Sequence, residues 1–352
     1  MQRTVDVGLI GYGMAGRVFH APLISSVSGL RLAAVVERRA DTARERYPRI
    51  AVVKDAAALF RMDNIELAVI ATPNATHFGL AREALLSGKH VVVDKPFTVL
   101  SSEARQLIDL ANAKGRILSV FQNRRWDGDF LTVAEIIRTK RLGSLSEFAS
   151  NFDRYRPGLR PNAWREQPGS GAGLLYDIGP HLIDQALVLF GMPTSVRADI
   201  RIQRVHGLTD DQFELSLNYD GLTATLTAGM LAREPRPRFL LRGTAGLFVK
   251  HGLDPQEEAL RLGGTQRDPG WGSEEPARWG IIERPDGTSG RQTVETVPGR
   301  YQAFYENVRD AIVNGAPLSV KPEQALNVIR IIELAIESSR EAKTVEMRSS
   351  VF

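Results

Sequence analysis

The chain has 352 residues, 43% of them hydrophobic and 24% charged, with a formal net charge of +4. This balance predicts a globular protein of two domains with a sizeable core and excludes intrinsic disorder. The sequence has no cysteine, and its histidines show no helical metal-ligand spacing, so we expect neither disulfides nor a bound metal. Without a dense basic run or an apolar stretch of about twenty residues, we expect a cytoplasmic protein that binds neither nucleic acid nor membranes.

The first third of the chain alternates apolar runs with helical stretches, in the rhythm of β-α-β units. We expect strands at residues 5–10, 31–36, 51–53, 66–71, 90–93 and 117–121. The pattern predicts a parallel sheet of about six strands covered by helices, in an α/β domain of residues 1–121. This is the architecture of a Rossmann dinucleotide-binding domain.

From Ser146 onward, apolar and polar residues alternate in the manner of antiparallel strands. We expect strands at 147–153, 196–205, 212–219, 222–230, 239–242 and 247–250, and helices at 180–190, 301–313 and 322–341. Residues 253–300 are rich in glycine, proline and charge, which predicts little regular structure. The second domain, residues 122–352, should therefore be of the α+β class, with a large, mostly antiparallel open sheet.

The run Gly11-Tyr12-Gly13-Met14-Ala15-Gly16 follows the first strand and opens a helical stretch. In such a run the first glycine permits a tight turn, the second lets the backbone approach a pyrophosphate, and the third lets the helix pack on the strand. The second strand ends at the acidic Glu37, about twenty residues later, as a dinucleotide site requires. We therefore predict a dinucleotide site, to which Gly11, Gly13, Met14, Ala15 and Gly16 contribute. The alternative is an ordinary tight turn.

The residues after the second strand bear on the choice of cofactor. Glu37 should accept hydrogen bonds from a free ribose 2′-hydroxyl and repel a 2′-phosphate. Arg38 or Arg39 could instead bind that phosphate or stack on the adenine. The signals conflict, and we expect NAD or NADP, with NAD favoured by the acidic residue.

Two polar segments follow later strands of the first domain, at the same edge of the sheet as the glycine run. Residues that could border the cofactor there are Thr72, Pro73, Asn74, His77, Asp94 and Lys95. For the first segment the alternative is a capped turn, with Asn74 or Thr76 at the start of the next helix. Lys95 ends a wholly apolar strand and is a candidate for proton transfer, the alternative being a surface lysine.

Asp177 and His181 are four residues apart. If one helix includes both, they share a face, and if the helix starts near Pro180, Asp177 precedes it and can still reach the imidazole. A carboxylate beside an imidazole forms an oriented base. The alternative is an N-cap followed by a core histidine.

These motifs resemble those of the Gfo/Idh/MocA oxidoreductases along the whole chain. The family's Glu-Lys-Pro motif appears as Asp94-Lys95-Pro96, and its Asp-x-x-x-His pair as Asp177 and His181. The resemblance implies that Lys95 is hydrogen-bonded to the reacting hydroxyl and that His181 accepts the proton. Asp177 would contact the substrate and position this network.

Longer strings at residues 121–127, 153–157, 164–166 and 250–258 resemble the bacterial scyllo-inositol dehydrogenase subgroup. This resemblance implies a polyhydroxylated substrate and a homodimer or homotetramer formed through the open sheet. It adds Asn123, Arg124, Tyr155 and Arg156 as substrate contacts, and Asn123, Trp164 and Arg165 as cofactor contacts. Trp126 and Tyr155 could instead build a wall between the domains.

The sequence thus predicts an NAD(P)-dependent oxidoreductase that moves a hydride between nicotinamide and a secondary alcohol of a cyclitol or sugar. A non-catalytic nucleotide-binding regulator of the same fold would not need Lys95, Asp177 and His181. An NAD-assisted glycoside hydrolase of the same fold is the other alternative, which a chromogenic glycoside would identify.

Overall fold

The computed structural model describes residues 3–39, 41–160, 163–284 and 290–347. The chain divides into two compact units, each assembled from three separate segments. Unit 1 comprises residues 1–126, 255–271 and 300–326, and unit 2 comprises residues 127–254, 272–299 and 327–352. Unit 1 therefore includes two segments from the last third of the chain.

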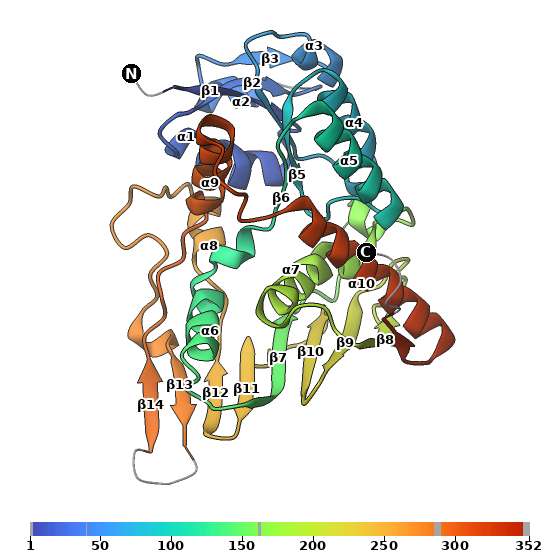
Figure 1. Ribbon diagram of the computed structural model, residues 1–352, viewed down its shortest axis with the longest axis vertical. Helices are drawn as coiled ribbons and strands as arrows, with labels where there is room; N and C mark the ends of the chain where they lie inside the picture. The colour runs from blue at the N-terminus through green and yellow to red at the C-terminus, as the bar shows by residue number, and fades with distance from the viewer. Residues whose placement is uncertain (1–2, 40, 161–162, 285–289, 348–352) are drawn as a thin grey trace. The chain divides into compact units, whose positions relative to one another are not determined.

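Unit 1 is built on a six-stranded sheet in the order β3-β2-β1-β4-β5-β6, in which every neighbouring pair is parallel. The strands are β1 (Val5–Ile10), β2 (Leu30–Val36), β3 (Ala51–Val53), β4 (Leu67–Ile70), β5 (His90–Asp94) and β6 (Leu118–Phe121). β1, β4 and β6 are buried along their whole length, because helices cover both faces of the sheet. This sheet confirms the predicted Rossmann architecture (Figure 1).

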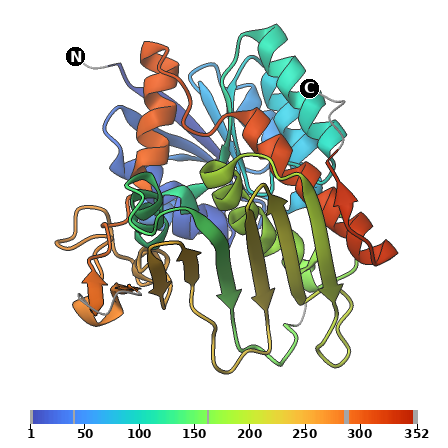
Figure 2. The same ribbon diagram turned by 60° about the horizontal axis from the view of Figure 1, so that its bottom comes forward.

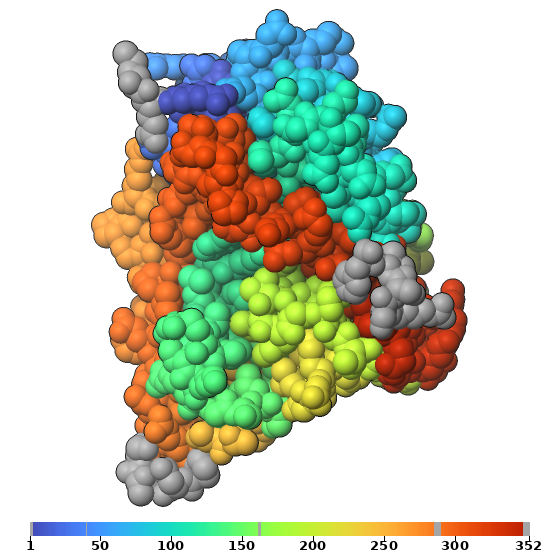
Figure 3. Space-filling view, viewed as in Figure 1, coloured from blue at the N-terminus to red at the C-terminus, as the bar shows by residue number. Residues whose placement is uncertain are grey.

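The helical elements of unit 1 are η1 (Gly16–His20), α1 (Ala21–Ser26), α2 (Thr42–Arg46), α3 (Ala56–Phe60), η2 (Asn74–Thr76), α4 (His77–Leu86), α5 (Ser101–Lys114), η3 (Asn123–Trp126), α8 (Gln256–Arg261) and α9 (Gln302–Asn314). α5 buries Ala104, Leu107, Ile108 and Ala111, which lie on one face at helical spacing. α4 and α5 pack side by side, and their side chains form a continuous surface at the upper right of Figure 3.

Unit 2 is built on a nine-stranded sheet in the order β14-β13-β12-β11-β7-β10-β9-β8-β15. The strands are β7 (Leu145–Asp153), β8 (Ser195–Arg201), β9 (Gln212–Tyr219), β10 (Leu222–Gly229), β11 (Phe239–Gly243), β12 (Gly246–Lys250), β13 (Gly280–Glu283), β14 (Arg291–Val294) and β15 (Val345–Glu346). The sheet is mostly antiparallel, as predicted, but β10 pairs with β7 in parallel. A parallel pair needs a long crossover, which α7, β8 and β9 supply here.

The helical elements of unit 2 are α6 (Gly128–Arg138), η4 (Trp164–Glu166), α7 (Gly173–Phe190), η5 (Pro276–Arg278) and the part of α10 (Pro322–Glu341) from residue 327 onward. α7 packs on β7, β9 and β10 (Figure 2). It begins at Gly173 and carries Pro180 in its interior, whereas the sequence predicted a helix from Pro180. Both Asp177 and His181 therefore lie on this helix.

The segment 253–300 contains more regular structure than its composition predicted. Within its described residues it forms α8, η5, β13 and β14. Gln256 in α8 is fully buried, which a polar, glycine-rich composition did not reveal. Among the described helices, none is both long enough and apolar enough to cross a membrane.

Candidate active site

The glycine loop between β1 and η1 has the geometry that a dinucleotide needs. Gly11 has a φ of +99°, which favours glycine, and a Cβ added to Gly16 would lie 2.1 Å from the carbonyl oxygen of Gly11. A Cβ added to Gly13 would meet nothing within 4 Å. The fold thus requires glycine at positions 11 and 16. Gly13 faces open space, in which a pyrophosphate can approach the backbone. The loop fits the cofactor predicted from the sequence.

Glu37 lies at the carboxyl end of β2 and is bound to the start of α2. Its carboxylate accepts hydrogen bonds from Thr42 Oγ1 at 2.6 Å and from the backbone N–H of Ala43 at 3.0 Å. Arg38 and Arg39 follow and are exposed. The carboxylate is therefore held in one place at the end of β2, and its contact with the ribose end of a cofactor stays a prediction.

His77 links the loops that follow β4 and β5. The ring is fully buried, with Nδ1 2.8 Å from the carbonyl oxygen of Pro96 and Nε2 3.0 Å from that of Thr72. Burial lowers the pKa of His77, while Asp94 and the two carbonyl oxygens oppose this shift. The two loops at this edge of the sheet are thereby fixed relative to each other.

The other predicted residues of the loop after β4 form a compact turn. Asn74 is buried, and Thr72 Oγ1 lies 2.6 Å from Thr76 Oγ1. Thr76 precedes α4, but its hydroxyl donates back to the carbonyl of Pro73 at 2.7 Å and does not cap the helix. Contacts of these residues with a cofactor stay a prediction.

Lys95 follows β5 directly, and its backbone is bound to the buried side chain of Asp94. Asp94 accepts a hydrogen bond from the backbone N–H of Lys95 at 2.9 Å and lies 3.6 Å from Nε2 of His20. The Nδ1 atom of His20 is 2.6 Å from the hydroxyl of Tyr305. Although desolvation opposes ionisation of the carboxyl, His20 and Lys95 hold the pKa of Asp94 below its ordinary value. Asp94 is therefore a buried carboxylate that fixes the backbone at Lys95.

Asp177 and His181 lie one turn apart on α7 in unit 2. Of the two alternatives left open by the sequence, the structure shows the shared helical face. Arg165 donates from Nε to Asp177 at 3.1 Å, and its guanidinium stands over the ring of Trp164 at 4.5 Å. Four of the predicted residues are thus brought together within unit 2, and His181 is buried.

Asp210 holds the start of α7 and was missed by the sequence analysis. Its Oδ2 accepts a hydrogen bond from the backbone N–H of Leu175 at 2.6 Å. Gly173 has a φ of +90°, and a Cβ there would lie 1.8 Å from Asp210 Oδ1, so this position requires glycine. Burial raises the pKa of Asp210 to about 6. Asp210 lies 37 residues from Gly173 in the sequence, so the residues around the start of the helix do not reveal it. Gly173 was the only local sign that a close contact occurs there.

Two of the remaining predicted substrate contacts, Arg124 and Tyr155, have side-chain partners inside the protein. Asn123 and Arg124 are buried in η3, and Arg124 Nη2 donates to Glu257 at 2.6 Å within unit 1. Tyr155 accepts a hydrogen bond from Arg233 at 2.9 Å in unit 2. Arg156 is exposed in the same unit. Their contacts with a substrate stay predictions.

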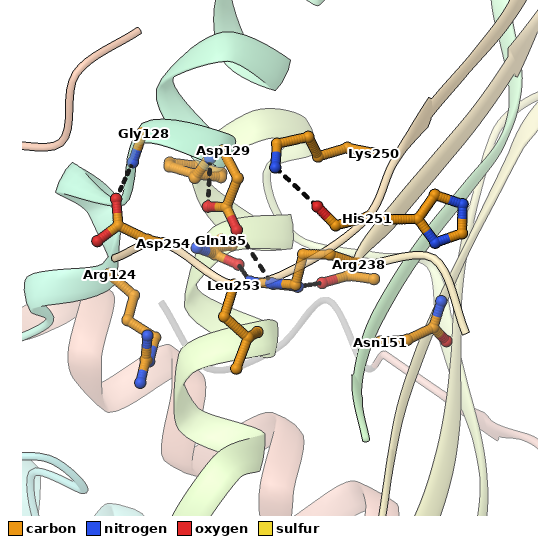
Figure 4. Close-up of polar contacts among 12 residues, drawn as sticks. Arg124, Gly128, Asp129, Asn151, Gln185, Arg238, Lys250, His251, Leu253 and Asp254 are labelled. Carbon is orange, nitrogen blue, oxygen red and sulfur yellow. Dashed lines mark hydrogen bonds and ion pairs between the residues drawn. The ribbon is translucent and has the colours of Figure 1, made fainter. Parts of the chain in front are cut away.

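Unit 2 also contains a buried polar cluster that the sequence analysis did not find (Figure 4). Arg238 donates to Ser150 at 2.5 Å and to Gln185 at 2.8 Å, and its Nε is 3.4 Å from Asp129. Lys250, the first residue of the motif 250–258, forms an ion pair with Glu274 at 3.0 Å, and both side chains are fully buried. These pairs join β7, β12, α6 and α7 with the residue before β11 and with the loop at Glu274, so they are part of the core.

Asp254 also belongs to this motif and accepts a hydrogen bond from the N–H of Gly128 at 2.7 Å, at the start of α6 (Figure 4). The first part of the motif is therefore structural. Among the described residues, no group of three histidine, aspartate or glutamate side chains could hold a metal ion.

Two family models match the chain. The model described as "Oxidoreductase family, NAD-binding Rossmann fold" matches residues 5–122, and "Oxidoreductase family, C-terminal alpha/beta domain" matches residues 134–347. Both belong to the Gfo/Idh/MocA group.

Similar proteins span the full length of the chain. The "Uncharacterized oxidoreductase YdgJ" of Escherichia coli is 44% identical, over 98% of this chain and 99% of its own. The "scyllo-inositol 2-dehydrogenase (NADP(+)) IolW" of Bacillus subtilis is 38% identical, over 97% and 96%. The solved structure of the putative oxidoreductase yvaA from Bacillus subtilis has a TM-score of 0.95 at 37% identity, covering 99% of both chains.

Proposed function

Because the chain belongs to the Gfo/Idh/MocA family of NAD(P)-dependent oxidoreductases, we propose that it oxidises a secondary alcohol of a cyclitol or sugar, with scyllo-inositol as the model substrate. The observation that carries this proposal is the place of Lys95. It follows β5 at the carboxyl edge of the sheet of unit 1, the edge at which β1 leads into the glycine loop. In parallel sheets, ligands bind at this edge.

We propose the following roles for the chain's own residues. The ammonium group of Lys95 in unit 1 donates a hydrogen bond to the reacting hydroxyl oxygen and stabilises the negative charge that develops there. The imidazole of His181 in unit 2 accepts the hydroxyl proton, and Asp177 orients the imidazole or the substrate from the same helical face. Bound nicotinamide would accept the hydride from the alcohol carbon.

The ion pair of Arg165 with Asp177 supports a positioning role for this part of unit 2. The pair is half-buried, with 35% and 20% of the two side chains exposed. Asp177 and His181 share a face of α7. A group that fixes the Asp177 carboxylate therefore also fixes which atoms a substrate can contact beside the His181 imidazole. Arg165 is thus proposed to position the site through Asp177.

We propose that NAD is the preferred cofactor, since the Glu37 carboxylate is held at the end of β2 by Thr42 and Ala43. A fixed carboxylate there accepts from a 2′-hydroxyl and repels a 2′-phosphate. The name of the Bacillus subtilis relative contains NADP(+), so cofactor preference varies among similar proteins if this proposal holds. The exposed Arg38 and Arg39 are the groups that could reverse it.

A panel of cyclitols and sugars, each incubated with NAD and with NADP, tests the proposal through the absorbance of reduced nicotinamide. We expect reduction of the cofactor with scyllo-inositol or a close stereoisomer. No reduction with any polyol would contradict it. Turnover of a chromogenic glycoside without net cofactor reduction would identify the glycoside hydrolase, and cofactor binding without any turnover would identify the regulator.

A further inference from the structure

α8 has a fixed place beside the glycine loop. It belongs to unit 1 and packs against η1, the helix that this loop opens. Gln256, fully buried at the start of α8, donates to the carbonyl of Trp126 at 3.0 Å and accepts from the N–H of Tyr301 at 2.8 Å. Tyr301 precedes α9, whose start lies close to α8 in Figure 1. Two distant parts of the sequence thus anchor α8 within unit 1.

Arg261, the last residue of α8, reaches the glycine loop itself. Its Nη2 atom lies 3.9 Å from Sδ of Met14, the residue that directly follows Gly13. The side chain of Arg261 is 45% exposed, and Met14 is 42% exposed. A guanidinium therefore stands at the solvent surface of the loop, next to the glycine whose Cβ position is open.

The carboxylate that binds Arg261 is shared with a second guanidinium group. Glu257 accepts from Arg124 through Oε2 at 2.6 Å, and from Nε and Nη2 of Arg261 through Oε1 at 3.0 and 2.8 Å. One carboxylate thus serves two guanidinium groups, and Arg124 is the buried one. The exposed pair within α8 contributes little to the stability of the fold.

We propose that Arg261 binds the diphosphate of the nicotinamide dinucleotide and that Glu257 holds the guanidinium in position. This inference rests on the proposed function, because it assumes that a dinucleotide occupies the glycine loop. A diphosphate offers oxygen atoms to the free N–H groups at a helix start, and a planar guanidinium can form two parallel hydrogen bonds to such oxygens. The cation comes from a segment about 245 residues beyond the loop, and α8 places it there.

The test measures dissociation constants of NADH and NADPH by isothermal titration calorimetry, with the full chain at low and high salt. We expect Arg261→Met to weaken both cofactors by at least about tenfold, because a charge-assisted pair is lost. The dissociation constants of Arg261→Lys should lie between those of the wild type and Arg261→Met, since lysine keeps the charge and loses the bidentate geometry. The matched control is Arg267→Met, which removes an exposed arginine of the same segment and should change either constant less than about twofold.

The outcomes separate this inference from the function on which it rests. If the wild-type protein binds neither dinucleotide, the proposed function fails. If it binds both and Arg261→Met binds them equally well, only the assignment of Arg261 is wrong. An equal loss in Arg261→Met and Arg267→Met would also overturn it, because general attraction would then explain the effect. Melting temperatures of all variants, together with binding by the charge-keeping Arg261→Lys, show whether the fold is intact.

Discussion

Single residues of the candidate site are immobilised by the fold itself. The backbone N–H of Lys95 is bound to the buried Asp94, which also faces His20. Glu37 is bound to the first turn of α2. A reacting or recognising group that is held before the substrate arrives loses less conformational freedom on binding, which favours catalysis and specificity.

The first prediction concerns Lys95. Lys95→Met should lower kcat by at least about a hundredfold, because the group that stabilises the developing alkoxide is lost. NADH binding, measured by calorimetry, should stay within about threefold of the wild type, since methionine retains the length of the side chain. The control is Lys89→Met, at a lysine that donates to the carbonyl of Met62 at 2.9 Å before β5. Turnover near that of the wild type in Lys95→Met would remove Lys95 from the mechanism.

The second prediction concerns cofactor choice at Glu37. Glu37→Ser should raise the ratio of kcat/KM for NADP over NAD by at least about tenfold, roughly 1.4 kcal/mol, because it removes a like charge and frees the N–H of Ala43. Glu37→Gln is the matched control for the fold, since its amide oxygen can still accept at the start of α2. It should raise the ratio as well. An unchanged ratio in both variants would show that the arginines alone determine the choice.

At the scale of elements, local patterns predicted most strands, and distant contacts determined the rest. Strand β1 and strand β9 match their predicted bounds because a buried or half-buried strand has an unmistakable apolar pattern. The start of α7 was placed too late, since proline within a helix is unfavourable and Asp210, which stabilises that start, is far away in the sequence.

The candidate site divides in the same way. The residue types of the glycine loop, the Asp-Lys-Pro turn and the Asp-His pair could be found from spacing alone. Their supports could not, because Asp210 for α7 and Gln256 for α8 act through contacts that join distant segments. α8 was also not predicted, because it lies within a polar and glycine-rich stretch. Sequence patterns thus identify chemical groups more readily than the residues that hold them.

The third prediction concerns the cap of α7. Asp210→Ala should lower the free energy of unfolding by about 1 kcal/mol and reduce kcat, because the N–H of Leu175 loses its acceptor on the helix that carries His181. Asp210→Asn should retain both, since an amide oxygen can accept the same bond. Urea unfolding and steady-state rates measure these effects. A fully active and stable Asp210→Ala variant would contradict this role.

The same carboxyl should make stability depend on pH. Its folded pKa, about 6, is raised above the unfolded value of 3.8, so the native state binds more protons between these values. The contribution of Asp210 to stability is therefore complete at low pH and is lost as the pH rises through about 6. Asp210→Asn, which cannot titrate, should gain stability relative to the wild type over that range.

The fourth prediction concerns the contact between β5 and β6. His90 Nδ1 accepts a hydrogen bond from the N–H of Ile117 at 2.9 Å, which requires an unprotonated nitrogen. Burial, aided by Arg116, lowers the pKa of His90 from 6.5 to about 4. Between these values the unfolded state binds more protons, so the contribution of His90 to stability should fall as the pH drops from about 6.5 towards 4, opposite in sign to that of Asp210.

The measurement compares unfolding of the wild type, His90→Asn and His251→Asn across that pH range. His90→Asn should flatten the dependence, whereas His251→Asn should leave it as in the wild type, because the side chain of His251 is exposed. A slope that is equal in all three proteins would show that other groups cause the loss.

At the scale of the whole molecule, each compact unit is assembled from segments that the chain order separates. Unit 1 gains α8 and α9 from the last third of the chain, and α8 brings Arg261 to the glycine loop. Unit 2 carries Asp177 and His181 on a helix packed on one face of its sheet. Assembly of a homodimer or homotetramer through that sheet stays a prediction.

The central claim is that a hydride passes from a carbon of the polyol to the nicotinamide. Its most direct test uses scyllo-inositol deuterated at every ring carbon, incubated with the protein and oxidised cofactor, and mass spectrometry of the reduced cofactor. We expect one deuterium on the nicotinamide ring of the reduced cofactor, and no deuterated cofactor with Lys95→Met. Reduced cofactor without deuterium, or no reduced cofactor from any deuterated cyclitol, would contradict the account.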